Sequence, residues 1–235
     1  MGLEAALGAL KAAMTPGGKT GWRPLAPVAE RSTILLDEAE AKALVARAGV
    51  PVPKGVSAPT LSALIGLAEG LVPPLALKGL GFAHKSEAGA VRLGLTDLHD
   101  QLNMEGATGY LAEEMVTGAV AELLIGLRRD PVYGVSLTVG LGGVTAELLA
   151  DTVTLILPAA EDEIRAALAR LKLWPLLDGY RGRAKADIAA VVAVVSRLAT
   201  LMINDPDLEE IEINPLIVRQ NGAVAVDALI RKAAP

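Results

Sequence analysis

The oxygen-bearing side chains near the end of the chain are its clearest candidates for chemistry. Glu212 and Asn214 lie in the apolar run EIEINPLIV, and Asp227 lies in the run AVAVDALI that follows it. The Asn221-Gly222 pair between the two runs is a strong hairpin signal, so we expect the runs to be paired strands. Two carboxylates and an amide form a hard-oxygen set, which Mg²⁺ prefers together with phosphate oxygens. The residues therefore predict a magnesium site on one face of a terminal hairpin.

The register of this hairpin decides whether the three side chains converge. A two-residue turn would place Ile217 opposite Val226. Because side chains alternate along a strand, Glu212, Asn214 and Asp227 would then share one face. Asn214 and Asp227 would be diagonal neighbours, about 7–8 Å apart, which is close enough for their oxygens to meet. The buried face would carry Ile213, Ile217, Val224 and Val226. The same spacing also fits the solvated face of an exposed hairpin.

A glycine-rich stretch, LALKGLGFAHKSEAGAVRLGL, spans residues 75–95 and holds a second group of candidates. Lys78 ends an apolar run in it, and His84, one of two histidines in the chain, follows in the loop. A neutral imidazole nitrogen is a good nucleophile near neutral pH. The residues alone fit a loop histidine bonded to a carbonyl as well as a functional one. The other histidine, His99 in LTDLHDQL, is predicted to be a surface residue.

The bulk composition narrows the class of protein. The chain has 235 residues, a formal net charge of −5 and no cysteine. Charges of both signs are spread along it, so we expect no nucleic-acid or membrane surface. The start of the chain lacks a signal-peptide pattern, and the most apolar segment, 188–203, carries Arg197 and is short of the roughly 20 residues of a spanning helix. We therefore expect a cytoplasmic protein in which this segment is a buried helix.

The elements that must position these residues follow from capping and periodicity. Asp37, with Glu40 three residues later, forms a capping-box pattern that predicts a helix ending near Gly49. Further helices are predicted over 60–69, 161–173 and 187–202. Strands are predicted in LALK, AVRLGL, YLAEEMV, AELLIGLRR, GVSLTVGL and the two terminal runs. This pattern indicates a mixed α/β chain in two lobes that divide near residue 107.

Six segments, in this order, resemble one known family. They are LLDEAEAKALVARAGVPVPKG, LALKGLGFAHKSEAGAVRLGL, EEMV, LIGLRRDPVYGVSLTVGLGGVTAELLAD, LLDGYRGR and the two terminal runs. Together they are similar to the ATP-grasp domain of the ADP-forming acyl-CoA synthetases, which are related to the β subunit of succinyl-CoA synthetase. The resemblance covers about residues 30–233. It implies a two-lobe α+β ATP-grasp fold, with a small lobe at 31–107, a large lobe at 108–235, and residues 1–30 as the tail of a preceding CoA-ligase region and linker.

The resemblance also implies roles for individual residues. Lys78 matches the lysine that reaches the nucleotide phosphates, and His84 matches the histidine that carries a phosphoryl group. Asn214 and Asp227 match the Mg²⁺ ligands, with Glu212 as a nearby helper. The hinge that holds adenine matches Glu113, Glu114, Met115 and Val116, and Glu122 matches the acid just beyond it. Arg128, Arg129, Arg181 and Arg183 fit either a phosphate or partner contact or ordinary surface charge.

The implied activity is that of an acid–thiol ligase: acid + CoA + ATP ⇌ acyl-CoA + ADP + phosphate. ATP or ADP and Mg²⁺ would bind this chain, while CoA and a small carboxylic acid would bind mainly a CoA-ligase partner subunit or domain. The chain departs from the family at Ala90, where a second glycine is usual, and between Leu95 and Tyr110, where the connection is short. The alternative is therefore a degenerate, non-catalytic nucleotide-sensing or scaffolding domain, as in a fused protein acetyltransferase.

Overall fold

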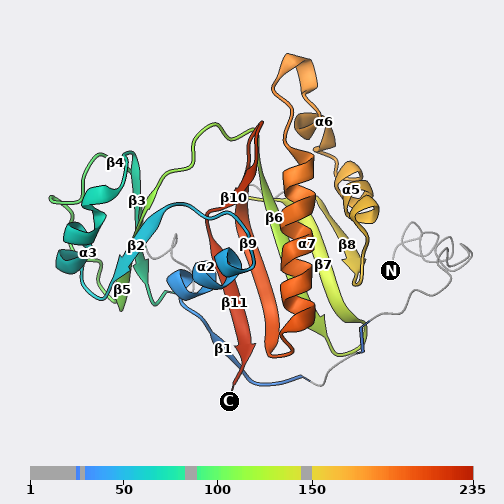
Figure 1. Ribbon diagram of the computed structural model, residues 1–235, viewed down its shortest axis with the longest axis horizontal. Coiled ribbons are helices and arrows are strands. Elements are labelled where there is room, and N and C mark those ends of the chain that lie inside the picture. The colour runs from blue at the N-terminus through green and yellow to red at the C-terminus, as the bar shows by residue number, and fades with distance from the viewer. Residues whose placement is uncertain (1–24, 27–29, 83–88, 144–149, 235) are drawn as a thin grey trace, which may run out of the picture.

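The structure of the protein is a computed structural model, and it describes residues 25–26, 30–82, 89–143 and 150–234. Two antiparallel sheets form its framework (Figure 1). The larger has seven strands in the order β1-β11-β9-β6-β7-β8, with β10 paired to β9. The smaller has four strands in the order β2-β5-β3-β4. The predicted mixed α/β class is confirmed. His84 and most of the predicted tail and linker at 1–30 lie outside the described residues.

The strands are β1 (Thr33–Leu35), β2 (Gly55–Ala58), β3 (Leu75–Leu80), β4 (Val91–Leu95), β5 (Gly109–Glu114), β6 (Ala121–Asp130), β7 (Gly134–Leu141), β8 (Thr152–Ile156), β9 (Leu208–Val218), β10 (Ala223–Ala225) and β11 (Ala228–Ala233). The α-helices are α2 (Glu38–Arg47), α3 (Leu61–Leu67), α5 (Glu161–Ala169), α6 (Trp174–Leu177) and α7 (Ile188–Asn204). Short 3₁₀ turns are η1 (Ala68–Gly70) and η2 (Tyr180–Gly182).

Helix α2 begins as its capping box predicts. The Glu40 N–H donates to Asp37 Oδ1 over 2.8 Å, and the Asp37 N–H donates to Glu40 Oε2 over 3.1 Å. Its buried residues are Glu38, Ala41, Lys42 and Val45, which recur at helical spacing on one stripe. Ala41 and Val45 join the core of the larger sheet. The helix therefore carries two charged side chains into the interior along with its apolar ones.

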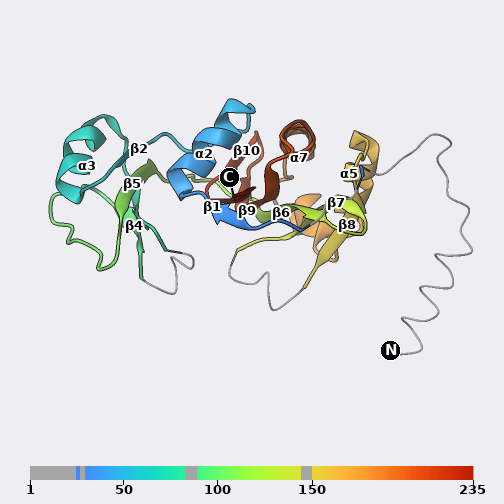
Figure 2. The same cartoon turned by 90° about the horizontal axis from the view of Figure 1, so that it is seen from below.

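Three helices, α2, α5 and α7, lie on the same face of the larger sheet (Figure 2). α7 is the predicted buried helix, with Val191, Val195 and Leu198 fully enclosed in the core. No helix of the described part of the chain is long and apolar enough to cross a membrane. The predicted cytoplasmic location stays a prediction.

We expect Leu198→Ala to lower the free energy of unfolding by about 2–5 kcal/mol, because it removes a buried side chain and leaves a cavity. Ile203→Ala on the same helix is the matched control, since Ile203 is 39% exposed and has less contact to lose. Urea denaturation measures both variants. Equal losses for the two would contradict the packing of α7 described here.

The smaller sheet has its own core beneath α3. Thr60 caps this helix by accepting from the Ala63 N–H over 3.2 Å, and Leu64, Leu77 and Ala112 are fully buried below it. Residues 96–108, between β4 and β5, contain no helix, so the short connection seen in the sequence is a loop. The smaller sheet is nonetheless complete enough to enclose an apolar core.

The two sheets do not divide the chain near residue 107. β5 pairs with β2 and β3 in the smaller sheet, while β1 pairs with β11 in the larger one. The smaller sheet is therefore drawn from residues 55–114 and the larger one from both sides of that segment, which differs from the predicted lobes 31–107 and 108–235. Sequence order hid this because β1 is short and its partner lies at the other end of the chain. The assignment of separate domains stays a prediction.

The predicted register of the terminal hairpin is wrong by two residues. Val224, not Val226, lies opposite Ile217, so the loop is longer than the Asn-Gly pair. A two-residue type I′ turn needs positive φ at both central residues, and of Asn221 and Gly222 only Gly222 has it. Asp187, at the start of α7, also accepts from the Gly222 N–H over 2.9 Å. The start of a helix that is distant in sequence thus contacts the turn.

Candidate functional site

A β-bulge in strand β9 lies at the centre of the candidate site. β6 pairs Leu123 with Leu216 and Ile125 with Ile213, so Asn214 and Pro215 together oppose one residue of β6. Such bulges re-aim side chains next to active sites. The bulge also reverses the alternation beyond it, which puts Leu216 and Val218 in the core. The prediction that Ile217 faces the core is therefore wrong.

Asn214 lies opposite Asp227 rather than diagonal to it. β9 pairs Leu216 with Ala225 and Ile213 with Ala228 in one continuous register, and the Val226 N–H donates to Pro215 O over 3.2 Å between these pairs. Directly opposite residues are closer than diagonal ones, so the corrected register brings the two predicted metal ligands nearer to each other.

The Asn214 side chain also meets a glycine turn after β7. The Gly143 N–H donates to Asn214 Oδ1 over 3.1 Å, and a Cβ at Gly143 would collide with the Glu122 carboxylate. Gly143 has φ of +73°, which favours glycine. Burial raises the pKa of Glu212, opposed by a hydrogen bond with Asn214 and assisted by the negative charges of Glu210 and Asp227. Glu122, Glu212, Asn214 and Asp227 thus form one acidic region. The signal for Gly143 in the sequence was its place in the Gly142-Gly143 pair.

Lys78 reaches this region from the smaller sheet. Its Nζ donates to Glu38 Oε1 over 2.5 Å and to Val226 O over 2.6 Å, and it lies 3.0 Å from Glu113 Oε2. Val226 is the residue before Asp227, so the lysine bridges the smaller sheet to the segment between β10 and β11. Burial acts to lower the pKa of Lys78, but the charges of Glu38, Glu113 and Asp227 outweigh it and raise the pKa above its ordinary value.

Lys42 completes a group of four buried charges that we call the ion-pair cluster: Glu38, Lys42, Lys78 and Glu113. Lys42 Nζ lies 2.6 Å from each Glu113 oxygen and 3.0 Å from Glu38 Oε1. The four side chains are at most 9% exposed. Burial lowers the pKa of Lys42, and the positive charge of Lys78 lowers it further, against the opposing effect of the two carboxylates. Glu38 and Lys42 were not among the residues predicted from the sequence, where they have the i, i+4 spacing of an ordinary helix ion pair.

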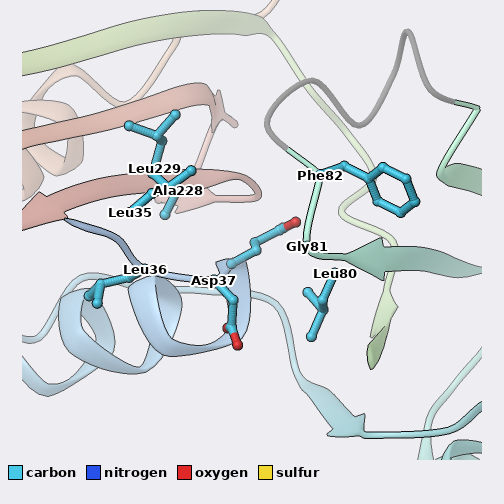
Figure 3. Close-up of a pocket in the computed structure, with 9 residues that line it drawn as sticks. Leu35, Leu36, Asp37, Leu80, Gly81, Phe82, Ala228 and Leu229 are labelled. Atoms are coloured by element: carbon cyan, nitrogen blue, oxygen red, sulfur yellow. The ribbon is translucent and has the colours of Figure 1, made fainter. Parts of the chain in front are cut away.

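A cavity of about 250 Å³ opens beside this cluster. Its walls are the β1–α2 junction, the end of β3 and the start of β11, with Asp37, Leu80, Phe82 and Ala228 among the labelled residues of Figure 3. Glu38 also lines it. At the β3 end, Gly81 has φ of +92°, and a Cβ there would lie 2.5 Å from Thr108 Oγ1. Glycine is therefore required at the point where the chain leaves β3 towards His84.

The predicted adenine hinge lies at the end of β5. The Glu113 side chain belongs to the ion-pair cluster. The Glu114 N–H donates to Lys54 O and the Met115 N–H to Pro74 O, each over 2.9 Å. An adenine held by these two donors would have to replace those carbonyls. Contact of Glu113, Glu114, Met115 and Val116 with adenine stays a prediction.

Of two further candidate residues, Arg129 has a structural position and His99 has a surface position. Arg129 donates to the carbonyl oxygens of Met202, Asp205 and Leu208, which ties β6 to the end of α7. The His99 side chain is 73% exposed, which confirms its predicted surface position. Among the described residues there is no group of three or more His, Cys, Asp or Glu side chains that could hold a metal. A metal at this site would therefore need the Asn214 amide together with carboxylates.

A family model described as the ATP-grasp domain matches residues 28–231. The chain belongs to the ATP-grasp family. Subunit β of acetate–CoA ligase (ADP-forming) II from Pyrococcus furiosus is 32% identical to this ATP-grasp chain over an alignment of 211 residues, which covers 82% of this chain and 89% of that subunit. The predicted resemblance to ADP-forming acyl-CoA synthetases is confirmed, and the chain corresponds to their ATP-grasp part.

Solved structures give the same family. Dinucleotide-forming acetyl-coenzyme A synthetase 1 of Ca. Korarchaeum cryptofilum, in complex with coenzyme A, Ca-AMPCP and HgCl⁺, has a TM-score of 0.75 and 27% identity, over 85% of this chain and 93% of that one. The same enzyme with coenzyme A and Mg-AMPPCP, whose phosphohistidine segment points towards the nucleotide binding site, has a TM-score of 0.71 and 28% identity, over 84% and 92%. The predicted ATP-grasp fold is therefore confirmed.

Proposed function

We propose that this chain is the nucleotide-binding half of an acyl-CoA synthetase (NDP-forming) and that it works with a CoA-binding half. One observation carries the proposal: Lys78 of the smaller sheet reaches Val226 O, beside the opposed pair Asn214 and Asp227 of the larger sheet. A cation and a hard-oxygen set thus meet at the junction of two sheets. Phosphoryl transfer asks a protein mainly to position groups and neutralise charge, and this arrangement supplies both kinds of group.

The donor set fits Mg²⁺, which takes one or two carboxylates and leaves its other positions to phosphate oxygens and water. Asp227 and Asn214 would hold the ion, with Glu212 nearby. When bound, Mg²⁺ neutralises phosphate charge. The protein itself orients the Asn214 oxygen through the Gly143 N–H and holds the Lys78 ammonium on Val226 O, beside Asp227.

His84 is the proposed phosphoryl carrier. A nitrogen of its imidazole forms a bond to the γ-phosphorus of ATP while the bond from that phosphorus to the bridging oxygen breaks, and ADP leaves with that oxygen. The phosphoryl group then passes to a histidine of the CoA-binding half and on to the acid, and CoA displaces phosphate from the acyl phosphate. The P. furiosus relative is named as a β subunit. This supports a partner for the present chain, which would supply the CoA and acid sites.

Phosphoprotein formation tests the proposal. The chain is incubated with Mg²⁺ and ATP labelled on its γ-phosphate, with and without the CoA-binding half. We expect protein-bound label that is stable in base and lost in acid, as a phosphoramidate behaves, and that is removed by ADP. Absence of such label under both conditions would contradict the proposed function.

Asp227→Asn is expected to weaken nucleotide binding in the presence of Mg²⁺ by about tenfold or more, because it removes one charge from a divalent-cation site while keeping the side-chain shape. Binding without Mg²⁺ should not weaken, since the substitution also removes a negative charge that faces the phosphates. Calorimetric titration with ATP measures both conditions. The control is Asp178→Asn, at an exposed ion pair with Lys185. An equal loss with and without Mg²⁺ would argue against Asp227 as a metal ligand.

The degenerate-module alternative depends on the short connection before β5. The structure has a loop at 96–108, yet the smaller sheet keeps its core and holds Lys78 in place. The relatives that match most of the chain are named as a subunit of a ligase and as a synthetase, which supports the enzyme and not the alternative.

A further inference from the structure

Lys78 is held by three oxygens. Its Nζ donates to Glu38 Oε1 and Val226 O, and it forms an ion pair with Glu113 Oε2 at 3.0 Å. An ammonium carries three donors, so a phosphate oxygen that binds Lys78 competes with these three oxygens. Drawing Lys78 away from Glu38 or Glu113 leaves a buried carboxylate with less compensating charge, which is unfavourable unless another cation stays beside it.

Lys42 is placed to be that cation. It lies within 3.0 Å of both carboxylates and bonds both oxygens of Glu113 over 2.6 Å. These short bonds and the two carboxylate charges favour the charged ammonium and oppose the lowering of the Lys42 pKa by burial and by Lys78. It comes from α2, which Ala41 and Val45 fix against the core of the larger sheet, so it need not move when Lys78 does. The two lysines have the same neighbours, but only Lys78 also reaches Val226 O beside the metal-site residues.

We propose that Lys42 is a positioning residue, which holds Glu38 and Glu113 so that Lys78 is free to bind nucleotide phosphate. This inference rests on the proposed nucleotide-binding function. It assigns a role to a buried charge that the phosphoryl-transfer chemistry does not use directly. It also explains why the cluster contains two lysines where a single phosphate ligand would need one.

Because the net charge of the ion-pair cluster affects phosphate binding, we expect two substitutions in it to change nucleotide affinity in opposite directions. With two lysines and two glutamates the cluster is neutral. Lys42→Met makes it negative, which retains Lys78 between both carboxylates and repels phosphate. Glu38→Gln makes it positive, which loosens Lys78 and attracts phosphate. A merely structural role of the cluster would weaken nucleotide binding in both variants, since both break buried ion pairs.

The test is a calorimetric titration of ATP with Mg²⁺ into the full chain and its variants. We expect Lys42→Met to raise the Kd by at least about tenfold and Glu38→Gln to lower it by about threefold or more. The double variant Lys42→Met/Glu38→Gln is neutral again, and its Kd should return to within about threefold of the wild type. Lys185→Met, at an exposed ion pair, is the control and should change nothing.

The outcomes separate this inference from the proposed function. A wild-type chain that does not bind nucleotide rejects both. A wild-type chain that binds, with Lys42→Met and Glu38→Gln both weaker, rejects only the role of Lys42. If Lys42→Met does not fold, Glu38→Gln and the double variant decide: tighter binding in the first and near-wild-type binding in the second support the proposal, and weaker binding in both overturns it.

Discussion

Replacing Lys78 with methionine is expected to raise the Kd for ATP with Mg²⁺ by about 100-fold or more. Removing one partner of a buried charge pair costs about 2–5 kcal/mol, and here the lost ammonium is also the proposed ligand of the nucleotide phosphates. The side chain is 9% exposed and contacts both carboxylates of the ion-pair cluster, so the thermal midpoint should fall as well. Calorimetry at a temperature where the variant remains folded by circular dichroism measures the binding effect.

Lys185→Met provides the comparison for this loss, because Lys185 pairs with Asp178 at an exposed position away from the two sheets' junction. Its nucleotide affinity should match that of the wild type. A folded Lys78→Met variant that binds as tightly as the wild type would remove Lys78 from the site, and with it the reason for placing phosphate at the junction of the sheets.

His84→Gln is expected to abolish phosphoprotein formation and to lower acyl-CoA synthesis, with the CoA-binding half present, by about 10³-fold or more, as loss of a covalent nucleophile does. Glutamine keeps a polar side chain of similar reach but provides no nucleophilic nitrogen. The Kd for ATP with Mg²⁺ should stay within about threefold of the wild type, since the carrier acts in transfer and not in binding. Thioester formation and protein-bound label measure the two activities.

The matched control is His99→Gln, at the other histidine of the chain, whose side chain is largely exposed. It should leave both activities unchanged. If the His84→Gln variant still forms phosphoprotein, another residue carries the phosphoryl group. That result would not contradict the proposed nucleotide-binding residues.

The parts of the fold that were predictable from the sequence are those set by local chemistry. The Asp37–Glu40 capping box predicted the start of α2, and the apolar character of 188–203 predicted a buried helix. The hairpin register was not predictable in the same way. The loop is longer than the Asn-Gly pair, and Asp187 binds it from the start of α7. The bulge of β9 against β6, which changes the residues that face the core beyond it, is not revealed by a single-strand pattern either. β1 was missed because its three residues form a strand only through pairing with β11.

The same distinction applies to the candidate site, where some residues were predictable from the sequence and others were not. Asn214 and Asp227 could be predicted together because they lie close in sequence, on β9 and in the segment between β10 and β11, and the shift by two residues left them opposite each other. The ion-pair cluster could not be predicted, because its members come from α2, β3 and β5, far apart in sequence. On a helix stripe, Glu38 and Lys42 look like an ordinary solvent-exposed pair at i, i+4 spacing; only the third and fourth charges make them a buried network.

A crystal structure of the chain with Mg²⁺ and a non-hydrolysable ATP analogue would show where the nucleotide phosphates bind. We expect the nucleotide at the junction of the two sheets, a phosphate oxygen within hydrogen-bond distance of Lys78 Nζ, and the metal ion on Asn214 and Asp227. Lys42 should remain bonded to Glu113 in that complex. A nucleotide bound elsewhere, with Lys78 still bonded to Glu38 and Val226 O, would contradict this expectation.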